Sequence, residues 1–215
     1  MSRPFLLVYG SGGHGKVVAD VAELAGFEVV GFLDDAEARQ GTQIWDLPVL
    51  SLDAALREQS RWPGVSVALG VGDNAARERC ASRAAEAGLP IVTLVHPRAN
   101  VARRVKLGEG VVVMSGASIN PDARLGAGCI VNTGAVVEHD CWLGDFVHLS
   151  PNAALGGAVV IGDRAHLGLG AVVLPGLRVG ANSRVGAGAA VIRNVSEGAT
   201  AVGVPAQSAA KVRSA

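Results

Sequence analysis

The sequence predicts an α/β domain followed by a parallel β-helix. Two observations support this prediction. A strand, a glycine-rich loop and a helix follow one another near the N-terminus, and a six-residue repeat of aliphatic side chains runs through the second half. Self-similarity at a fixed short period is typical of solenoid folds, whose core is built by stacking. We expect a first domain at 1–94 and a second, with a C-terminal tail, at 95–215.

The first ninety residues alternate strands with helices. We expect strands over 5–9, 28–33, 66–70 and 91–95, and helices over 16–25 and 75–87. The loop Gly10-Ser11-Gly12-Gly13-His14-Gly15 matches G-x-G-x-x-G, and the second strand ends in Asp34-Asp35. Such glycines let a phosphate approach a helix N-terminus, and the acid commonly binds a ribose hydroxyl or a base N–H. This half-size Rossmann-like unit suits a mononucleotide or a nucleotide-sugar better than NAD. A glycine turn without a ligand is the alternative.

The repeat can be counted in hexads, that is, in sixes from Val101. The first position is aliphatic in all sixteen hexads, and the fifth is small or aliphatic in fifteen. The second is Gly in eight and Asn in two, residues that tolerate the positive φ of a tight corner. Each hexad therefore predicts a short strand and a corner, and three hexads make one coil of 18 residues. Residues 18 apart should then stack in parallel strands about 4.8 Å apart.

This stacking places His139 beside Gly157 and His148 beside His166. The three cysteines are Cys80, Cys129 and Cys141, an odd number without C-x-x-C spacing. A disulfide framework or a zinc knuckle is therefore a poor interpretation, and a reducing cytoplasm fits best. Cys129 and Cys141 occupy the fifth, inward position and are expected to be small core residues.

Charge and hydropathy exclude several kinds of partner. The formal net charge is zero, from 19 basic and 19 acidic residues, so no footprint for nucleic acid or an anionic membrane is expected. No apolar stretch reaches the roughly 18 residues of a spanning helix. The apolar run at 5–9 is too short for a signal-peptide core. We expect a soluble, cytoplasmic protein.

Four motifs together resemble the hexapeptide-repeat nucleotide-sugar N-acetyltransferases, which modify nucleotide-linked 4-amino-4,6-dideoxy sugars. The motifs are the glycine loop at 10–15, Phe32-Leu33-Asp34-Asp35, Val137-Glu138-His139-Asp140-Cys141 and Gly203-Val204-Pro205-Ala206. The resemblance covers essentially the whole chain. It implies a left-handed β-helix, a homotrimer, and acetyl-CoA as co-substrate in the groove between neighbouring helices, without a metal. Well-known members acetylate UDP-linked bacillosamine precursors and GDP-perosamine. Gln207 departs from the Lys or Arg that relatives often carry there.

The resemblance also implies roles for individual residues. His139 would be the general base, Asp140 would orient it, and the Gly157 N–H would face the developing oxyanion. Imidazole suits the first role because its ordinary pKa lies near neutrality. Positions matching acetyl-CoA contacts are His148, Leu169 and Ala187. Positions matching nucleotide-sugar contacts are Gly12, Gly13, His14, Asp34, Asp35 and Gly70.

Other functions stay open at this point. A related transferase could O-acetylate a sugar such as sialic acid. An NAD-dependent oxidoreductase could use the glycine loop, although half of a dinucleotide domain is missing. A zinc-dependent lyase could use His148 and His166, although no third histidine follows at a suitable offset. Taken alone, His139 could be a solvated corner residue, and His166 could line a subunit groove. Residue types do not distinguish guanine from uracil or thymine, the sugar's stereochemistry, or acetyl from a slightly larger acyl group.

Overall fold

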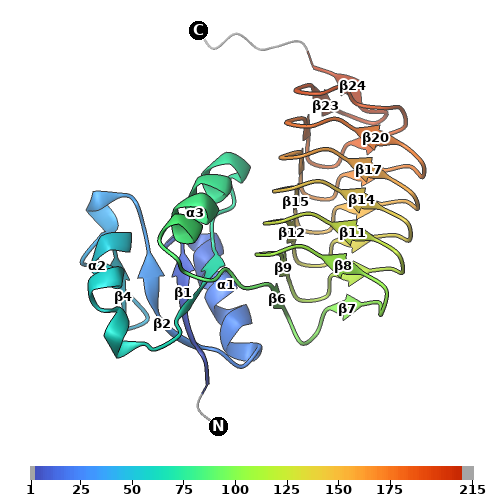
Figure 1. Ribbon diagram of the computed structural model, residues 1–215. Helices are drawn as coiled ribbons and strands as arrows, with labels where there is room; N and C mark the ends of the chain where they lie inside the picture. The colour runs from blue at the N-terminus through green and yellow to red at the C-terminus, as the bar shows by residue number, and fades with distance from the viewer. Residues whose placement is uncertain (1–2, 210–215) are drawn as a thin grey trace, which may run out of the picture. The chain divides into compact units, whose positions relative to one another are not determined.

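The structure is a computed structural model that describes residues 3–209 (Figure 1). These residues form two compact units that divide between Pro97 and Arg98. The expected boundary, between residues 94 and 95, lies three residues before this division. The units are an α/β unit and a β-helix, and we describe each by itself.

The N-terminal unit is built around a five-stranded sheet. Its strand order is β3 (Gln43–Ile44), β4 (Leu47–Leu50), β2 (Glu28–Leu33), β1 (Phe5–Tyr9) and β5 (Ser66–Leu69). Its helices are α1 (Gly13–Leu24), α2 (Leu52–Arg57) and α3 (Asn74–Glu86), with 3-10 turns at Glu37–Arg39 and Gln59–Arg61. Strand β1 pairs in parallel with β2 on one side and β5 on the other. The loop after β1 therefore emerges where the strand order reverses, the usual ligand site of open α/β sheets.

Most predicted elements of this unit are confirmed. The first two strands have the expected bounds, and α3 is displaced from its prediction by one residue. Helix α1 begins at Gly13, earlier than the expected residue 16, because its first turn lies inside the glycine loop. The strand expected at 91–95 is reduced to a bridge at Ile91 and the short β6 (Leu94–Val95). Within residues 3–209, no helix is both long enough and apolar enough to cross a membrane.

The C-terminal unit is the predicted parallel β-helix, with sixteen two-residue strands before its last turns. The strands are β7 (Asn100–Val101), β8 (Lys106–Leu107), β9 (Val112–Val113), β10 (Ser118–Ile119), β11 (Arg124–Leu125), β12 (Ile130–Val131), β13 (Val136–Val137), β14 (Trp142–Leu143), β15 (His148–Leu149), β16 (Ala154–Leu155), β17 (Val160–Ile161), β18 (His166–Leu167), β19 (Val172–Val173), β20 (Arg178–Val179), β21 (Arg184–Val185), β22 (Ala190–Val191), β23 (Thr200–Val202) and β24 (Gln207–Ser208). Each of the first sixteen ends on the aliphatic first position of a hexad and begins on the sixth position of the hexad before it.

The coil length of 18 residues is confirmed by the strand register. Val137 pairs with Leu155, and His148 pairs with His166, in both cases in parallel. Every third strand belongs to the same sheet, so β10, β13 and β16 are neighbours on one face, while β11, β14 and β17 are neighbours on the next. The first and fifth positions fill the core. Cys129 and Cys141 are buried there, as predicted, and their thiols donate to the carbonyls of Gly144 and Gly156.

The prediction about the corner glycines was wrong. Positive φ values occur at the fourth position of the hexad, not at the second. The residues are Gly110, Gly116, Asp122, Gly128, Gly134, Asp140, Phe146, Asn152, Ala158, Arg164, Gly170, Gly176, Asn182 and Gly188. The second-position glycines serve a different purpose. A Cβ on Gly162 would lie 2.4 Å from the backbone nitrogen of Ala181 in the next coil. Glycine is needed there because successive coils approach too closely for a side chain.

Candidate active site

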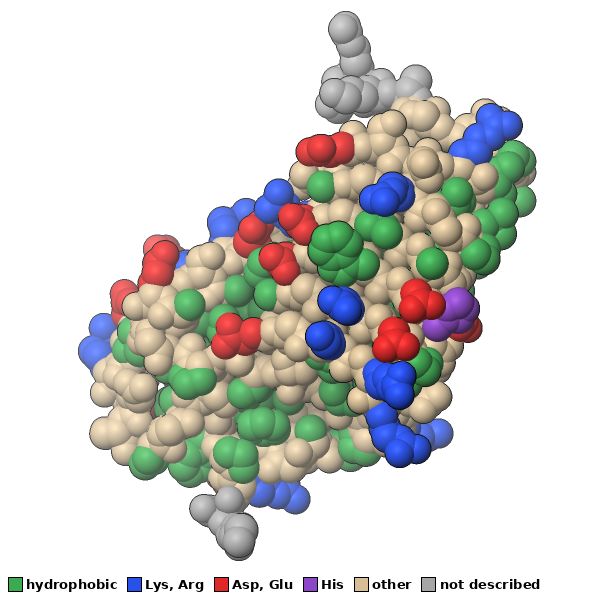
Figure 2. All heavy atoms as spheres, turned by 45° about the vertical axis from the view of Figure 1, so that its right-hand side comes forward, with side chains coloured by type: hydrophobic (Ala, Val, Ile, Leu, Met, Phe, Trp, Pro, Cys, Tyr) green, Lys and Arg blue, Asp and Glu red, His purple; other side chains and the backbone are tan. Residues whose placement is uncertain are grey.

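His139 and Asp140 form an exposed pair at the corner between β13 and β14. His139 Nδ1 lies 2.7 Å from Asp140 Oδ2, and both side chains are 61% exposed. Because a carboxylate only accepts hydrogen bonds, Nδ1 carries the hydrogen and Nε2 is left to accept a proton. Figure 2 shows histidine surface bordered by acidic side chains. The hydrogen bond to Asp140 raises the pKa of His139; desolvation opposes this, and the charges of Asp140 and Glu138 add to it.

Gly157 lies one coil above His139, as the 18-residue spacing predicts. The Ala158 N–H donates to the His139 carbonyl at 2.8 Å, which joins the two corners. A Cβ on Gly157 would lie 2.6 Å from both Cε1 and Nε2 of the His139 ring. The imidazole therefore lies against the bare Cα of a glycine, at a distance that would not accommodate a larger residue.

The backbone N–H of Gly157 differs from equivalent groups at other corners. The third-position amides of Ala127 and Asp145 donate to the carboxylates of Asp145 and Asp163, at 2.7 and 2.9 Å, each 18 residues further on. The residue 18 positions after Gly157 is Pro175, which has no side-chain acceptor. Among residues 3–209, no acceptor pairs with the Gly157 N–H. This N–H therefore has no protein acceptor, and it belongs to the residue whose Cα lies against the His139 ring.

The second pair of histidines lies on a different sheet. The rings of His148 and His166 are stacked, with centroids 4.7 Å apart and an interplanar angle of 13°. His148 Nε2 lies 3.2 Å from Asn132 Nδ2, and His166 Nε2 lies 2.9 Å from Ser150 Oγ. Over the described part of the chain, no group of three or more His, Cys, Asp or Glu side chains could hold a metal ion.

The other two residues expected to contact the coenzyme lie at the next corner along from this sheet. Leu169 is 58% exposed, and its carbonyl accepts from the Gly188 N–H at 2.8 Å, so Leu169 and the neighbouring Ala187 stack one coil apart. The structure thus places these two residues at one corner and His139 at another.

The N-terminal unit contains a cavity of about 520 Å³ at the glycine loop. All six residues predicted to contact the nucleotide-sugar line it: Gly12, Gly13, His14, Asp34, Asp35 and Gly70. A Cβ on Gly12 or Gly13 would meet nothing within 4 Å, so these glycines leave open space where α1 begins. Gly15 is glycine for another reason, because its Cβ would lie 1.9 Å from the Gly10 carbonyl oxygen.

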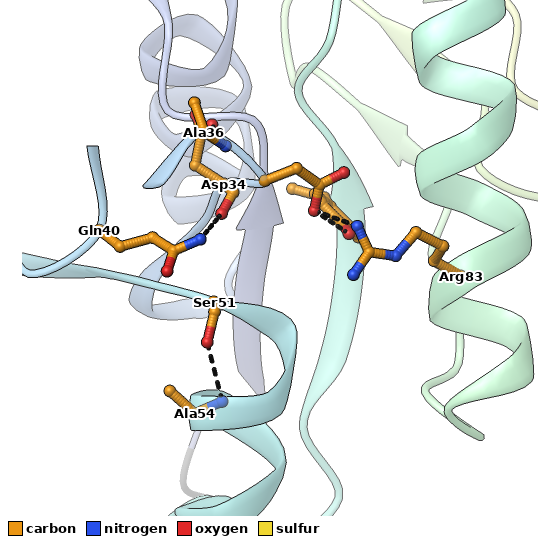
Figure 3. Close-up of polar contacts among 8 residues, drawn as sticks. Asp34, Ala36, Gln40, Ser51, Ala54 and Arg83 are labelled. Atoms are coloured by element: carbon orange, nitrogen blue, oxygen red, sulfur yellow. Dashed lines mark hydrogen bonds and ion pairs between the residues drawn. The ribbon is translucent and has the colours of Figure 1, made fainter. Parts of the chain in front are cut away.

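Asp34 holds the glycine loop in place. Its carboxylate accepts hydrogen bonds from the N–H of Ser11 at 3.0 Å, from the Ser11 hydroxyl, and from the Ala36 N–H at 2.9 Å. Figure 3 shows the Gln40 amide, which donates to the Asp34 carbonyl at 3.0 Å. Burial acts to raise the pKa of Asp34. The hydrogen bonds from Ser11 and Ala36 to its carboxylate outweigh burial, so the pKa is lowered overall. Both carboxylate oxygens therefore contact the protein itself.

Asp35 is held by two side chains whose position no sequence pattern predicted. The Tyr9 hydroxyl donates to Asp35 Oδ1 at 2.7 Å. Arg83, whose guanidinium extends from α3 in Figure 3, reaches the same oxygen through Nη1 at 2.5 Å. Burial, followed by the hydrogen bond to Asp35, raises the pKa of Tyr9, so the phenol remains neutral. Both contacts engage Oδ1, and within residues 3–209 Oδ2 has no hydrogen-bond partner.

Further cavity residues come from α3 and from the turn at Glu37–Arg39. Ala76, Arg79 and Cys80 line the cavity from α3, and Arg39 lines it from the turn. Together with Arg83, the α3 residues follow the i, i+3, i+4, i+7 spacing of one helix face, the only signal that could have found them. Burial, followed by the charge of Asp35, raises the pKa of Cys80 to about 11. Its thiol is therefore not a nucleophile at neutral pH.

His14 is the remaining titratable group of the glycine loop. Burial, followed by the charge of Arg77, lowers the pKa of His14 to about 4, so this ring is neutral at physiological pH.

An α/β unit with a glycine-lined cavity, followed by a hexad β-helix with an exposed His–Asp pair, is the arrangement of hexapeptide-repeat acyltransferases. The family described as PglD N-terminal domain matches residues 5–84, and the bacterial transferase hexapeptide (six repeats) matches residues 104–139. The chain is similar to a solved structure of a histidine-to-asparagine mutant of perosamine N-acetyltransferase from Caulobacter crescentus in complex with CoA and GDP-perosamine. That match has 40% identity and a TM-score of 0.89, and covers 96% of this chain and 97% of the other.

Two further relatives to which the chain is similar are also acetyltransferases. The acetyltransferase domain of PglB from Neisseria gonorrhoeae, solved in complex with acetyl coenzyme A, is 37% identical over 96% of this chain and 100% of that one, with a TM-score of 0.88. The curated UDP-N-acetylbacillosamine N-acetyltransferase of Bacillus subtilis (strain 168) is 40% identical over 110 residues, which span half of each protein. The chain belongs to the family of hexapeptide-repeat nucleotide-sugar N-acetyltransferases. The predicted family and fold class are confirmed, and so, at the level of the family, is acetyl-CoA as co-substrate.

Proposed function

We propose that this protein transfers the acetyl group of acetyl-CoA to the 4-amino group of a nucleotide-linked 4-amino-4,6-dideoxy sugar, with GDP-perosamine as the favoured acceptor. The observation that carries the proposal is the exposed His139 ring. Its Nδ1 is bound to Asp140, and its Nε2 edge lies against Gly157.

The reaction needs a proton acceptor and an oxyanion donor, and this corner offers both. The neutral amine nitrogen attacks the thioester carbonyl carbon, the C–N bond forms, and the carbonyl π electrons move to oxygen. His139 Nε2 takes the proton that the nitrogen loses. The oxyanion then collapses, the C–S bond breaks, and the leaving thiolate takes the proton back from the imidazolium. No acyl-enzyme forms, which agrees with the inward-facing, buried Cys141.

Gly157 supplies the oxyanion donor in this proposal. Its N–H has no acceptor among the described residues, and its Cα lies against the His139 ring. One such preorganised donor is worth about 3 kcal/mol of transition-state stabilisation. Asp140 keeps the imidazole in the tautomer that accepts at Nε2, and it makes that nitrogen more basic.

The nucleotide is assigned to the cavity at the glycine loop. The α1 N-terminus and the open faces of Gly12 and Gly13 suit a diphosphate, since helix N-termini attract anions. The unoccupied Oδ2 of Asp35 suits a base that offers N–H donors. Guanine, uracil and thymine all present such an N–H, and the similarity to the GDP-perosamine complex is what favours a guanine nucleotide.

Acetyl-CoA is assigned to His148, Leu169 and Ala187, in a homotrimer. Outward positions on the sheet of β13, β16, β19 and β22 are apolar, and Val172 there is 41% exposed. At the adjacent corner Leu174 and Ile192 are 50% and 42% exposed. An apolar stripe of this kind is typical of an interface between copies of one chain. The cysteines are free thiols, in keeping with a reducing cytoplasm.

The test is a thiol-release assay with acetyl-CoA and a panel of GDP-, UDP- and dTDP-linked 4-amino sugars. We expect the GDP-linked 4-amino-4,6-dideoxy sugar to give the highest kcat/KM. Matched sugars with a 4-hydroxyl should give no transfer. A preference for the hydroxyl sugars would replace N-acetylation with O-acetylation, and the absence of thiol release from every amino sugar would refute the proposal.

A further inference from the structure

A buried guanidinium in the N-terminal unit has no role in the proposed reaction. Arg77, in the first turn of α3, is 0% exposed and is the largest fully buried side chain in the described part of the chain. Arginine is almost never fully buried without partners, because its charge cannot be neutralised by losing a proton. The contacts of Arg77 therefore need a reason.

Three of these contacts converge on the segment 70–74, which joins β5 to α3. Arg77 Nη1 donates to the carbonyls of Val71 and Gly72, each at 3.1 Å, and Nη2 donates to Asn74 Oδ1 at 2.9 Å. Val71 and Gly72 line the cavity, whereas Arg77 itself is not a lining residue. The planar guanidinium holds several acceptors in a fixed arrangement, which the ammonium of a lysine cannot reproduce. Arg77 therefore supports one wall of the cavity without facing its interior.

The segment that Arg77 holds packs directly against the glycine loop. The Gly70 N–H donates to the Tyr9 carbonyl at 2.8 Å, and a Cβ on Gly70 would lie 2.9 Å from the Gly15 Cα. A Cβ on Gly10 would lie 2.7 Å from the Gly70 carbonyl oxygen. The two segments touch backbone to backbone, so a shift of one displaces the other.

The charge of Arg77 also acts on the glycine loop. Burial, followed by the charge of Arg77, lowers the pKa of His14 to about 4. His14 lines the cavity from the first turn of α1. The fixed cation therefore keeps a second cation from forming in the cavity wall, and the imidazole remains a neutral hydrogen-bonding group.

We infer that Arg77 is a positioning residue for the nucleotide-sugar. It holds the carbonyls of Val71 and Gly72 and, through Gly70, fixes the glycine loop to which the diphosphate is assigned. It acts through these two segments and contacts neither the ligand nor the reacting atoms. The inference rests on the proposed function, because it names a residue that shapes the acceptor's cavity.

The test compares Arg77→Met with Arg77→Lys in the thiol-release assay with the GDP-linked amino sugar. Methionine keeps an unbranched apolar side chain without charge or donors, whereas lysine keeps the charge but loses the planar donor set. We expect the KM for the acceptor to rise about tenfold in Arg77→Met and about threefold in Arg77→Lys. The kcat and the KM for acetyl-CoA should stay within about twofold of the wild type, because the reacting corner lies in the β-helix.

Ala84→Gly is the matched control for stability. Ala84 is also fully buried on α3, about two turns beyond Arg77, and does not line the cavity. A glycine inside a helix destabilises it without changing a residue of the cavity wall. The acceptor KM of this variant should equal that of the wild type. An equal rise in Ala84→Gly and Arg77→Met would make Arg77 a residue of stability alone and overturn the inference.

A second measurement follows the charge. NMR titration of the His14 ring, assigned with His14→Gln, should give a higher pKa in Arg77→Met than in the wild type, because removal of a nearby cation favours the imidazolium. Ala84→Gly should leave the pKa of His14 unchanged. An unmoved pKa in Arg77→Met would mean that Arg77 does not act on the glycine loop, which overturns the inference.

The remaining outcomes also decide the matter. An unchanged acceptor KM in Arg77→Met overturns the inference, as does a rise of the same size in the KM for acetyl-CoA. If Arg77→Met does not fold, Arg77→Lys decides, and failure of both to fold would place Arg77 in the framework and overturn its positioning role. In each of these cases the wild type still acetylates the amino sugar, so the proposed function stands. If the wild type acetylates none of the panel, both fail.

Discussion

The two units of this protein build their sites in opposite ways. In the N-terminal unit the cavity is formed by residues from β1, the glycine loop, the end of β2, the turn at Glu37–Arg39 and α3. Asp34 and Asp35 are held there by side chains and amides from several of these segments. In the β-helix, by contrast, the neighbours of a residue in the two adjacent coils are the residues 18 positions before and after it in the sequence.

The difference shows how a regular fold acquires a site. The β-helix repeats one local geometry, so its candidate site arises where the residues of one corner depart from those at the others. At that corner the third position is His139, the next coil has Gly157, and the coil beyond has Pro175 in place of an acidic cap. The N-terminal unit has no repeat to depart from, and its site depends on contacts between distant segments.

The strongest test of this contrast is His139→Asn. It removes the base from one corner and leaves the hexad pattern intact. We expect kcat to fall roughly 10²–10⁴-fold, the usual contribution of a general base. The melting temperature and the affinity for CoA should be unchanged, as measured by thermal unfolding and calorimetry. Near-normal turnover would remove the base assignment.

Gly157→Ala tests whether Gly157 is needed for activity but not for folding. The new Cβ would lie 2.6 Å from the His139 ring, an exposed side chain that can move away. We therefore expect kcat to fall about a hundredfold while the melting temperature changes little. Steady-state assays and thermal unfolding on the same sample check both parts. A variant that unfolds would mean that Gly157 belongs to the framework.

Gly162→Ala is the opposite case, because its new Cβ would lie 2.4 Å from backbone that cannot move. We expect a loss of about 3 kcal/mol in the free energy of unfolding. Gly170→Ala is the matched control, with a φ of +63° and nothing within 4 Å, and it should cost only about 1 kcal/mol. Urea unfolding measures both. Equal losses would contradict the assignment of second-position glycines to coil stacking.

Asp140→Asn should reduce kcat about tenfold and change its pH dependence. As a base, His139 must be neutral, so the rate rises as pH passes through its pKa. The hydrogen bond to Asp140 raises that pKa, and its loss should move the acidic limb of the profile to lower pH. A profile of kcat against pH measures the shift. An unmoved acidic limb would show that Asp140 does not act on His139.

Asp34→Asn should have the smallest effect. The amide cannot accept from the N–H and hydroxyl of Ser11 as strongly as a carboxylate does, so the glycine loop should loosen. We expect a rise of about threefold in the KM for the nucleotide-sugar and none in the KM for acetyl-CoA. In the wild type the carboxylate contacts are present above the ordinary pKa of Asp and are lost as pH falls through the lowered pKa. A larger effect on acetyl-CoA would contradict this role.

The repeat is the part of the fold that sequence predicts best. The hexad pattern indicates directly which residues are buried, because one aliphatic and one small residue in every six must face the core. The strands ending at Val101 through Val191 and the approach of Gly157 to His139 followed from counting alone. The position within the hexad at which φ is positive did not follow from counting. Gly is common at the second position, but Asp140, Phe146 and Arg164 adopt positive φ at the fourth, because the shape of the corner overrides side-chain preference.

The N-terminal site was predicted less completely. The glycine motif and Asp34-Asp35 located the cavity, since both sit at strand ends. The contacts of Tyr9 and Arg83 with Asp35 join residues 26 and 48 positions away, and no local pattern carries such pairings. The same holds for Asp34, whose hydrogen bonds with the N–H and hydroxyl of Ser11 join residues 23 positions apart.

The unbroken run of hexads has a consequence for water. With no insertion between Val101 and Val191, the coils provide no flap that could fold over the imidazole. A thioester bound at this corner is therefore shielded only by what docks there, whether the acceptor or another folded surface. We expect slow hydrolysis of acetyl-CoA when the acceptor is missing, and suppression of this leak once the acceptor fills the corner.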